Sequence, residues 1–342
     1  MATNDNSLKA SYLALSEIPQ EAMELYREVQ HLEFNHNEFL YIPPSISLFK
    51  NVTVLDFGYN KIKIISKEIT ELVNLKILQM RCNHLSESSF PKEFQELSEL
   101  EVLNVCNNRL LEIPYQFFEL RKLKYLQLGG NLIREVPKAI EQLSDLEILY
   151  LGGNRLSEIP SEIGNLNNLT SLILSDNHLF SIPDSLNKLT KLLSLSLHNN
   201  NLRVLPQSIV KLENLEELSL RSNPLVAKFI KEMDHEIPSL LELAARYMLN
   251  YNIPYNSNEI PSSLKKYLST SHKCVNPECN GVYFTARCEQ IKFVDFCGKY
   301  KLPLLQYLCS PQCQVFTSAE SSTESEEDIV IPPNQLRRVL LG

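Results

Sequence analysis

Four cysteines in the last part of the sequence are spaced as two close pairs. Cys274 and Cys279 form a C-x4-C pair, and Cys309 and Cys313 form a C-x3-C pair. Thiolates grouped in pairs are the ligands of structural zinc sites, and a small module with few apolar residues gains stability from such a metal. These four residues are therefore predicted to hold one structural zinc ion, although the pairs are wider than the C-x2-C of tight zinc sites.

Other features of the sequence bear on this interpretation. Cys288 and Cys297 are alternative ligands, and buried free thiols are the competing interpretation.

The opening residues lack the basic start and apolar core of a secretory signal, and no run of about 18 apolar residues predicts a transmembrane helix. We expect a cytoplasmic chain, with the nucleus open as a second compartment. In such a chain the eight cysteines are expected as thiols or metal ligands rather than disulfides.

Charge and motifs argue against an enzyme and against nucleic-acid binding. The net charge is −8, whereas a nucleic-acid surface must be basic to replace phosphate counterions. The sequence has no phosphate-binding glycine loop and no H-E-x-x-H, and its seven histidines are scattered. We therefore expect no catalytic residues, and neither nucleic acid nor a membrane as a partner.

A repeat occupies most of the chain. Asparagine recurs every 23 residues, with one interval of 25, and closes segments such as LKYLQLGGNLI (123–133). The pattern L-x-x-L-x-L-x-x-N-x-L is the signature of leucine-rich repeats. Leu126 and Leu128 lie two apart on a short strand and point to the core, whereas Tyr125 points outward. The recurring residues are Asn37, Asn60, Asn83, Asn108, Asn131, Asn154, Asn177, Asn200 and Asn223.

The repeats predict an α/β solenoid, a leucine-rich-repeat horseshoe with a parallel sheet on its concave face. Apolar-proline pairs such as Ile159-Pro160 suit an irregular convex side with short helical turns. A small helical and cysteine-containing module follows the array. The predicted segments are an N-terminal cap (1–28), nine repeats (29–235), a two-helix segment (236–270), the cysteine module (271–316) and an acidic, serine-rich, largely disordered tail with kinase-like sites (317–342).

The concave face of repeats two to six is expected to bind a protein. Its outward strand positions form an apolar column, and aromatic and arginine side chains beside the column are the usual anchors of interfaces. The glycine pairs 129–130 and 152–153 are expected to let a partner's backbone approach the sheet. The preference of strands for β-branched residues is the competing explanation. The predicted binding residues are Val54, Ile77, Val102, Tyr125 and Ile148, with Tyr59, Arg81 and Tyr150 as anchors.

Two amphipathic segments follow the array. PSLLELAARYML (238–249) predicts a helix with Ser239 as N-cap and Glu242 completing a capping box. Its apolar residues fall on one helical face, and a second segment, IPSSLKKYLST (260–270), has a similar face. The face of the first segment consists of Leu240, Leu243, Ala244, Tyr247 and Met248.

The pair of segments resembles the suppressor-of-cytokine-signalling box, in which a BC-box helix binds elongin C and a cullin box selects the cullin. Leu240 matches the family's invariant leucine, Ala244 stands where the family usually has cysteine, and Met248 takes the final apolar position. The resemblance implies that the face listed above binds elongin C. The segment 260–268 fits the cullin-2 box and lacks the Leu-Pro of the cullin-5 version, which tolerates variation, so both cullins stay open. The implied cullin-binding residues are Ile260, Pro261, Leu264 and Leu268.

The whole layout resembles leucine-rich-repeat proteins that carry a C-terminal elongin/cullin-binding box. That resemblance implies a non-catalytic substrate-recognition subunit of an elongin B/C–cullin–RING ubiquitin ligase. An unidentified protein would bind the concave face and be ubiquitinated and degraded. The alternative is a cytosolic leucine-rich-repeat scaffold whose C-terminal segment only caps the solenoid.

Overall fold

The fold is described from a computed structural model. It describes residues 2–4, 6–225, 238–253, 260–276, 279–296, 300–314 and 338–340. The chain divides into two compact units. The first contains residues 1–202, 208–224 and 332–342, and the second contains residues 203–207 and 225–331.

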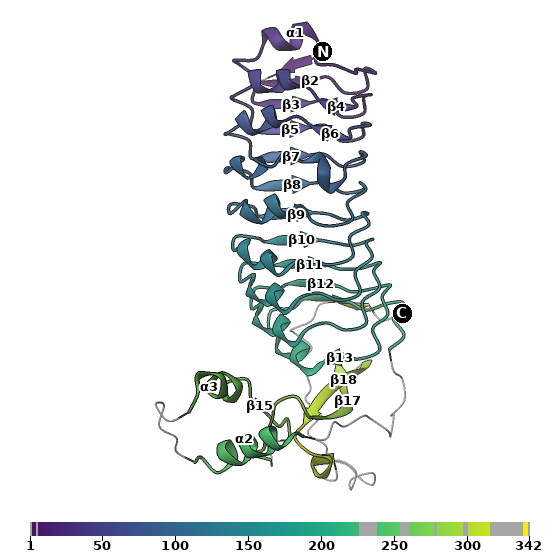
Figure 1. The fold of residues 1–342 in the computed structure, drawn as a ribbon. Coiled ribbons are helices and arrows are strands. Elements are labelled where there is room, and N and C mark those ends of the chain that lie inside the picture. The colour runs from purple at the N-terminus through teal and green to yellow at the C-terminus, as the bar shows by residue number, and fades with distance from the viewer. Residues whose placement is uncertain are drawn as a thin grey trace. The chain divides into compact units, whose positions relative to one another are not determined.

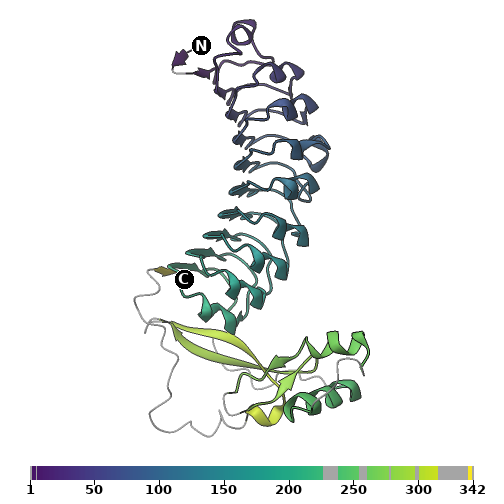
Figure 2. The ribbon, with the colours of Figure 1, turned by 90° about the vertical axis from the view of Figure 1, so that its left-hand side faces the viewer.

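The first unit is built on a 12-stranded sheet (Figures 1 and 2). Nine short strands, one for each predicted repeat, pair in parallel, which confirms the leucine-rich-repeat solenoid. Figure 2 shows the strands along one side of this unit and short helices along the opposite side. The strands are β3 (His31–Glu33), β5 (Val54–Asp56), β7 (Ile77–Gln79), β8 (Val102–Asn104), β9 (Tyr125–Gln127), β10 (Ile148–Tyr150), β11 (Ser171–Ile173), β12 (Ser194–Ser196) and β14 (Glu217–Ser219).

Non-repeat segments extend the sheet at both of its edges. Strand β2 (Ser7–Lys9) pairs in parallel with β3, and β1 (Ala2–Asn4) pairs with β2 in the antiparallel sense. Helix α1 (Gln20–Glu24) follows in the segment that was predicted as a cap. At the other edge, β19 (Arg338–Leu340) pairs in parallel with β14. These three residues fall in the predicted tail, whose acidic serine-rich stretch 317–328 lies outside the described residues.

Short 3-10 helices form the opposite side of the repeats. In most of them the proline of the apolar-proline pair is the N-cap, since its fixed φ suits the extended backbone before the turn. The longer third repeat has two such helices instead of one, and two short strands of two residues each form one parallel pair in the first two repeats. The helices are 44–48, 67–71, 87–89, 94–96, 115–119, 138–142, 161–165, 184–188 and 207–211, and the short strands are β4 (Tyr41–Ile42) and β6 (Ile64–Ile65).

The second unit combines two helices with small sheets. A hairpin of β17 (Cys288–Phe296) and β18 (Tyr300–Leu308) is its longest element, and β13 (Leu205–Pro206) pairs with β18. Its other elements are α2 (Leu240–Asn250), α3 (Ser262–Leu268), β15 (His272–Lys273), β16 (Val282–Tyr283) and a 3-10 helix at Pro311–Gln314. Among the described residues, no helix is both long and apolar enough to cross a membrane.

The repeat asparagines hold successive turns of the array together. The Asn131 amide nitrogen donates to Leu128 O at 2.8 Å within its own repeat and to Val105 O at 3.0 Å in the preceding repeat. Its Oδ1 accepts from Leu110 N at 3.1 Å. Because Asn131 is only 4% exposed, water does not offer these backbone groups an alternative partner. One side chain thus satisfies polar groups of two adjacent turns.

Replacement of Asn131 by alanine is expected to lower the free energy of unfolding by about 3 kcal/mol or more. The change leaves buried carbonyl and N–H groups unpaired, and each such group costs about 1–3 kcal/mol. Urea unfolding of the full chain, followed by circular dichroism, measures the effect. Asn168→Ala is the control, because the bonds of half-buried Asn168, to Ser144 O and from Lys191 Nζ, both lie at the exposed surface. Equal losses of unfolding free energy in the two variants would contradict this account of the repeat asparagines.

Candidate functional site

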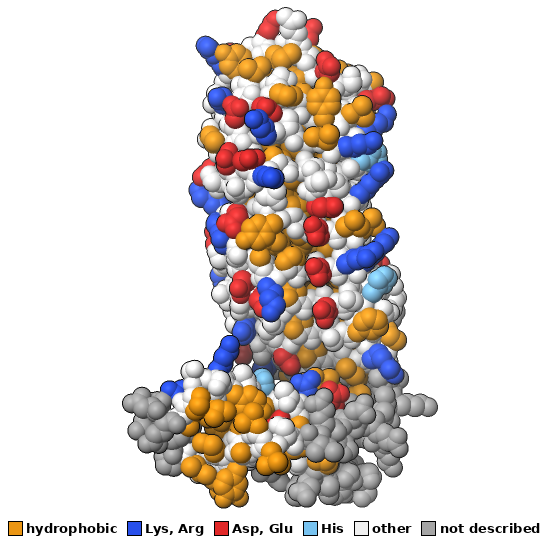
Figure 3. Space-filling model, in the orientation of Figure 1, with side chains coloured by type: hydrophobic (Ala, Val, Ile, Leu, Met, Phe, Trp, Pro, Cys, Tyr) orange, Lys and Arg blue, Asp and Glu red, His pale blue; other side chains and the backbone are white. Residues whose placement is uncertain are grey.

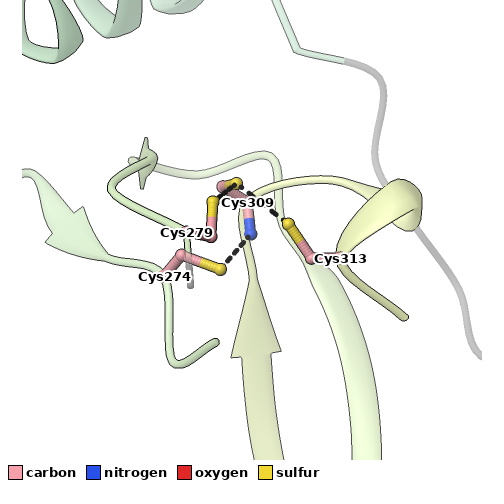
Figure 4. Close-up of side chains that lie close together, drawn as sticks. All are labelled: Cys274, Cys279, Cys309 and Cys313. Carbon is pink, nitrogen blue, oxygen red and sulfur yellow. Dashed lines mark hydrogen bonds between the residues drawn. The ribbon is translucent and has the colours of Figure 1, made fainter. Parts of the chain in front are cut away.

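The four predicted metal ligands converge in the second unit (Figure 4). The Sγ atoms of Cys274, Cys279, Cys309 and Cys313 all lie within 4.8 Å of one another. Cys274 follows β15, Cys309 follows β18, and Cys313 lies in the 3-10 helix at Pro311–Gln314. The prediction that these four thiols come together is confirmed.

The thiol geometry fits a tetrahedral metal ion. Zn–S bonds of about 2.3 Å place sulfur atoms about 3.8 Å apart. The Cys279 Sγ lies 3.5 Å from the Cys309 Sγ, which lies 3.6 Å from the Cys313 Sγ. Backbone N–H groups of Gly281 and Cys309 point at Cys279 Sγ and Cys274 Sγ, as they would toward thiolates. A bound divalent cation would therefore suit the four thiols, their spacing and the backbone N–H groups that point at them.

A bound cation would change the charge state of these thiols. Burial raises the pKa of the Cys309 thiol, and its hydrogen bonds with Cys279 and Cys313 raise it further. A coordinating metal would reverse this balance, because it would stabilise the thiolate form directly. Cys288 packs against the cluster but is not among the four converging ligands, and Cys297 lies outside the described residues.

The start of helix α2 is only partly as predicted. Ser239 is the N-cap, and its Oγ accepts a hydrogen bond from Glu242 N at 3.2 Å. The predicted capping box also required the Glu242 side chain to turn back to Ser239. That expectation was wrong, because the carboxylate is directed into the second unit instead.

Glu242 is the buried polar anchor of α2. Its side chain is 0% exposed and accepts hydrogen bonds from Phe284 N at 3.0 Å, Ala286 N at 3.1 Å and Thr285 Oγ1 at 2.9 Å. Arg246 Nη2 pairs with it at 2.6 Å. Arg246 lies four residues along the same helix, whereas the partners at 284–286 lie more than 40 residues away and no local pattern in the sequence signals them.

This network sets the charge state of Glu242. Burial alone would raise the carboxyl pKa, but the backbone donors of Ala286 and Phe284, together with Arg246 and Thr285, lower it to about 2. The ionised carboxylate stabilises the folded chain fully above its ordinary pKa of 4.5, and this stabilisation is lost as the pH falls toward 2. At neutral pH that contribution is about 3 kcal/mol.

The inner face of α2 is small. Apart from Glu242, Ala245 is its buried residue, at 4% exposed. Ala245 packs in a cluster with Leu268 of α3 and with Phe284, and Leu249 contacts the edge of this cluster. The helix therefore has an inner face that belongs to its own unit.

The outer face of α2 is apolar and open. Leu240 is 88% exposed, Leu243 is 50% exposed and Tyr247 is 59% exposed. Ala244 is exposed and Met248 is half-buried. The five predicted elongin-binding residues thus lie away from the helix's buried contacts, and Figure 3 shows apolar side chains gathered over α2. Prediction missed Leu241 and Tyr251, which are 50% and 69% exposed.

The four predicted cullin-binding residues divide into two kinds. Leu268 is 8% exposed and belongs to the core of the second unit, and half-buried Ile260 packs against that core. Pro261, the N-cap of α3, is exposed, and Leu264 is half-buried. Pro261 and Leu264 remain accessible to a partner.

The predicted concave column is a continuous row in the sheet. Direct strand pairing aligns Val54, Ile77, Val102, Tyr125 and Ile148, and each of these side chains is half-buried. The row then changes character, because its next members are serines at 171 and 194. Tyr125 OH donates to Glu147 Oε2 at 3.3 Å, so its ring is held beside an acidic group.

Aromatic rings also stack beside the first strands. His36 lies between Tyr12 and Tyr59, with ring centroids 4.2 Å apart on each side. The Arg81 guanidinium lies over the Tyr59 ring, 5.2 Å from its centroid. Prediction identified Tyr59 and Arg81 as anchors but missed Tyr12 and His36. The position of His36 directly before Asn37, matching Tyr59 before Asn60, was the available signal for His36, whereas Tyr12 precedes Leu13 and carries no such signal.

The glycine pairs 129–130 and 152–153 were expected to let a partner's backbone approach the sheet, but another side chain of the array occupies this space. A Cβ on Gly129 would lie 2.6 Å from Tyr150 Cζ, and a Cβ on Gly152 would lie 2.6 Å from Tyr150 Cε2. The Tyr150 ring therefore lies over both glycines, and burial raises its pKa. The expectation that these glycines admit a partner's backbone was wrong, since they accommodate Tyr150.

His198, one of the scattered histidines, has several polar partners. His198 Nδ1 lies 3.0 Å from Ser196 Oγ and 3.2 Å from Ser219 Oγ. His198 Nε2 lies 3.7 Å from Asp176 Oδ2. The late repeats thus carry a hydrogen-bonded polar group where the early repeats carry the apolar row.

Two solved structures resemble the fold. The leucine-rich-repeat ectodomain of the plant membrane receptor kinase GASSHO1/SCHENGEN3 from Arabidopsis thaliana matches 60% of this chain and 26% of its own, with a TM-score of 0.53 and 30% identity. A TDR receptor matches 64% of this chain and 39% of its own, with a TM-score of 0.56 and 29% identity.

Curated relatives share the name leucine-rich repeat-containing protein 58. The Xenopus laevis protein is 46% identical over 35% of each chain. The Homo sapiens protein is 52% identical over 26% of this chain and 24% of its own. The aligned part of the chain thus spans about a third or less of the length of these relatives.

Family models match both the repeats and the region that follows them. The model described as leucine rich repeat matches residues 98–156. The model described as leucine-rich repeat region matches residues 138–317, which is more than half of the chain. Together with the repeat asparagines and the parallel sheet, these matches establish that the chain belongs to the leucine-rich-repeat family.

Proposed function

We propose that this chain is the substrate-recognition subunit of an elongin B/C–cullin–RING ubiquitin ligase. The outward apolar face of α2 carries the proposal. Leu240, at the position of the invariant leucine of the BC box, is 88% exposed. A helix that presents leucine and tyrosine to water is stabilised when a partner's groove covers it, which is the helix-in-groove mode of recognition.

The helix has the two faces that such a role requires. Glu242 and Ala245 hold it to its own unit, and this leaves Leu240, Leu243 and Tyr247 free for elongin C. Pro261 and Leu264 on α3 are the accessible residues for cullin-2 or cullin-5. The buried Leu268 then supports α3 from below rather than contacting the cullin.

The repeat array supplies the substrate surface in this proposal. The row from Val54 to Ile148 presents apolar side chains in register, and Tyr59 and Arg81 lie beside the row. The chain makes and breaks no bond. It holds the substrate close to the ubiquitin-charged enzyme, so that transfer becomes an effectively intramolecular step.

The thiol cluster has a structural role in this proposal. Cys274, Cys279, Cys309 and Cys313 would hold one zinc ion, which stabilises a module of short strands that has few buried apolar residues. A bound ion would cross-link the chain segments that carry the four thiolates.

Leu240→Ser is expected to abolish binding to elongins B and C without destabilising the chain. Loss of a buried leucine contact costs about 2–5 kcal/mol in the complex, whereas Leu240 is solvated in the free chain. Calorimetric titration with purified elongin B/C measures the first effect, and thermal unfolding measures the second. Leu111→Ser, which changes a 48% exposed leucine of the array, should leave both unchanged. Unchanged elongin binding by Leu240→Ser would refute the proposal.

Purified chain is expected to contain one zinc per molecule. Cys309→Ser should lower the zinc content, because it removes a central ligand of the cluster. Cys82→Ser in the array and Cys288→Ser beside the cluster should both retain the zinc. Elemental analysis under reducing conditions gives the stoichiometry. A folded second unit without zinc would remove the metal from the proposal.

Tyr125→Glu is expected to block substrate capture while elongin binding persists. A carboxylate buried within the row would lie unpaired in the complex, at a cost of about 3–5 kcal/mol. Quantitative proteomics of cells that lack the endogenous protein identifies the proteins that accumulate. The wild-type chain should restore their levels, and Tyr125→Glu should not.

The control for this experiment is Ser194→Glu, at the same row position three strands further along. It adds the same charge outside the apolar part of the row and should restore degradation. The neighbouring Ser196 is not used as the control, because it is hydrogen-bonded to His198 and its replacement would also remove that bond. If Ser194→Glu fails and Tyr125→Glu succeeds, the substrate surface lies on the later repeats.

A further inference from the structure

Arg246 connects helix α2 to the thiol cluster. Its Nη1 donates to the backbone oxygen of Cys309 at 2.8 Å, and Cys309 is one of the four converging ligands. Its Nε and Nη2 donate to Glu242 Oε1, at 3.1 Å and 2.6 Å, and Nη2 also donates to Ala286 O. The Arg246 side chain is only 13% exposed, so these bonds are shielded from water.

Glu242 completes the connection. Its two carboxylate oxygens accept hydrogen bonds from residues 284–286, the segment between β16 and β17. The pair of Glu242 and Arg246 therefore ties α2 to the strand region on one side and to the Cys309 backbone on the other. Apart from the bonds between Arg246 and Glu242 themselves, these bonds end on residues 284–286 and on the backbone of Cys309, one of the four converging cysteines.

Apolar packing of α2 within its own unit is limited to Ala245 and to Leu249, which packs against the edge of the Ala245 cluster. Within α2 the buried residues are Glu242 and Ala245, and an alanine buries little area. The larger apolar residues, such as Leu240 and Tyr247, face outward. The orientation of α2 thus depends on polar bonds, which require their backbone partners to be fixed in place.

We propose that metal binding at the four cysteines controls the presentation of α2 through Arg246 and Glu242. With the metal bound, Cys309 and residues 284–286 are fixed, and the helix is held with Leu240 outward. Without it, those backbone partners lose their positions and α2 is released. The chain then binds its helix-recognising partner less tightly, in proportion to the fraction of molecules in which α2 remains ordered. The identity of this partner rests on the proposed function, whereas the coupling within the second unit does not.

The first test compares the full-length chain loaded with Zn²⁺ and stripped by a chelator. Hydrogen–deuterium exchange of peptides from residues 240–250 reports the order of α2 without any partner present. Stripping should speed this exchange at least tenfold, while peptides from the array at residues 123–133 stay unchanged. Unchanged exchange of α2 after complete loss of zinc would overturn the proposal.

The second test breaks the connection and keeps the metal. Arg246→Lys retains the positive charge, but a single amine cannot reach Glu242, Ala286 O and Cys309 O together. This variant should keep one zinc per chain and still show at least tenfold faster exchange in α2. Arg221→Lys, an exposed arginine of the array, is the matched control and should match the wild type. Wild-type exchange of α2 in Arg246→Lys would also overturn the proposal.

Titration with purified elongin B/C separates this inference from the proposed function. If both hold, zinc removal and Arg246→Lys each weaken binding at least tenfold, and restored zinc recovers it in the wild type alone. If loaded chain with a protected α2 does not bind elongin B/C, the proposed function fails while the coupling stands. If elongin B/C binds loaded and stripped chain equally, the coupling fails while the proposed function stands.

Discussion

A leucine-rich solenoid turns its chain inside an apolar core, so the backbone N–H and C=O groups of every turn must find hydrogen-bond partners within the protein. Each repeat strand is only three residues long, so strand pairing satisfies few of these groups. The asparagine after each strand satisfies the others, and Asn131 does so for its own turn and the preceding one. Since the same geometry recurs at every repeat, the array, the register of its sheet and the surface row all depend on this side chain.

The second unit follows a different physical scheme. Its helix α2 directs a carboxylate and a guanidinium inward and its large apolar residues outward, the reverse of an ordinary surface helix. Such an arrangement is stable only where buried charges are paired and fully hydrogen-bonded, as Glu242 is. The polar anchor leaves the apolar face available for another molecule, and this division of roles supports the proposed partner-binding helix.

The sequence was sufficient to predict the features that local periodicity determines. The repeat strands, the row from Val54 to Ile148 and the convergence of four cysteines follow from spacing alone. Features that depend on distant partners were not predictable. Glu242 was assigned to a capping box, because its partners at 284–286 carry no local signal. The glycines at 129 and 152 were interpreted as open surface, because nothing in the sequence shows which way the Tyr150 ring turns.

Strand β19 has a consequence for the order of folding. It pairs with β14, yet residues 220–337 separate the two strands along the chain. The entropy cost of closing a loop grows with its length, so contacts between adjacent repeats form earlier than this one. Until β19 docks, the edge of β14 exposes unpaired N–H and C=O groups that recruit strands from other chains. The lifetime of that open edge therefore sets how readily the nascent array aggregates.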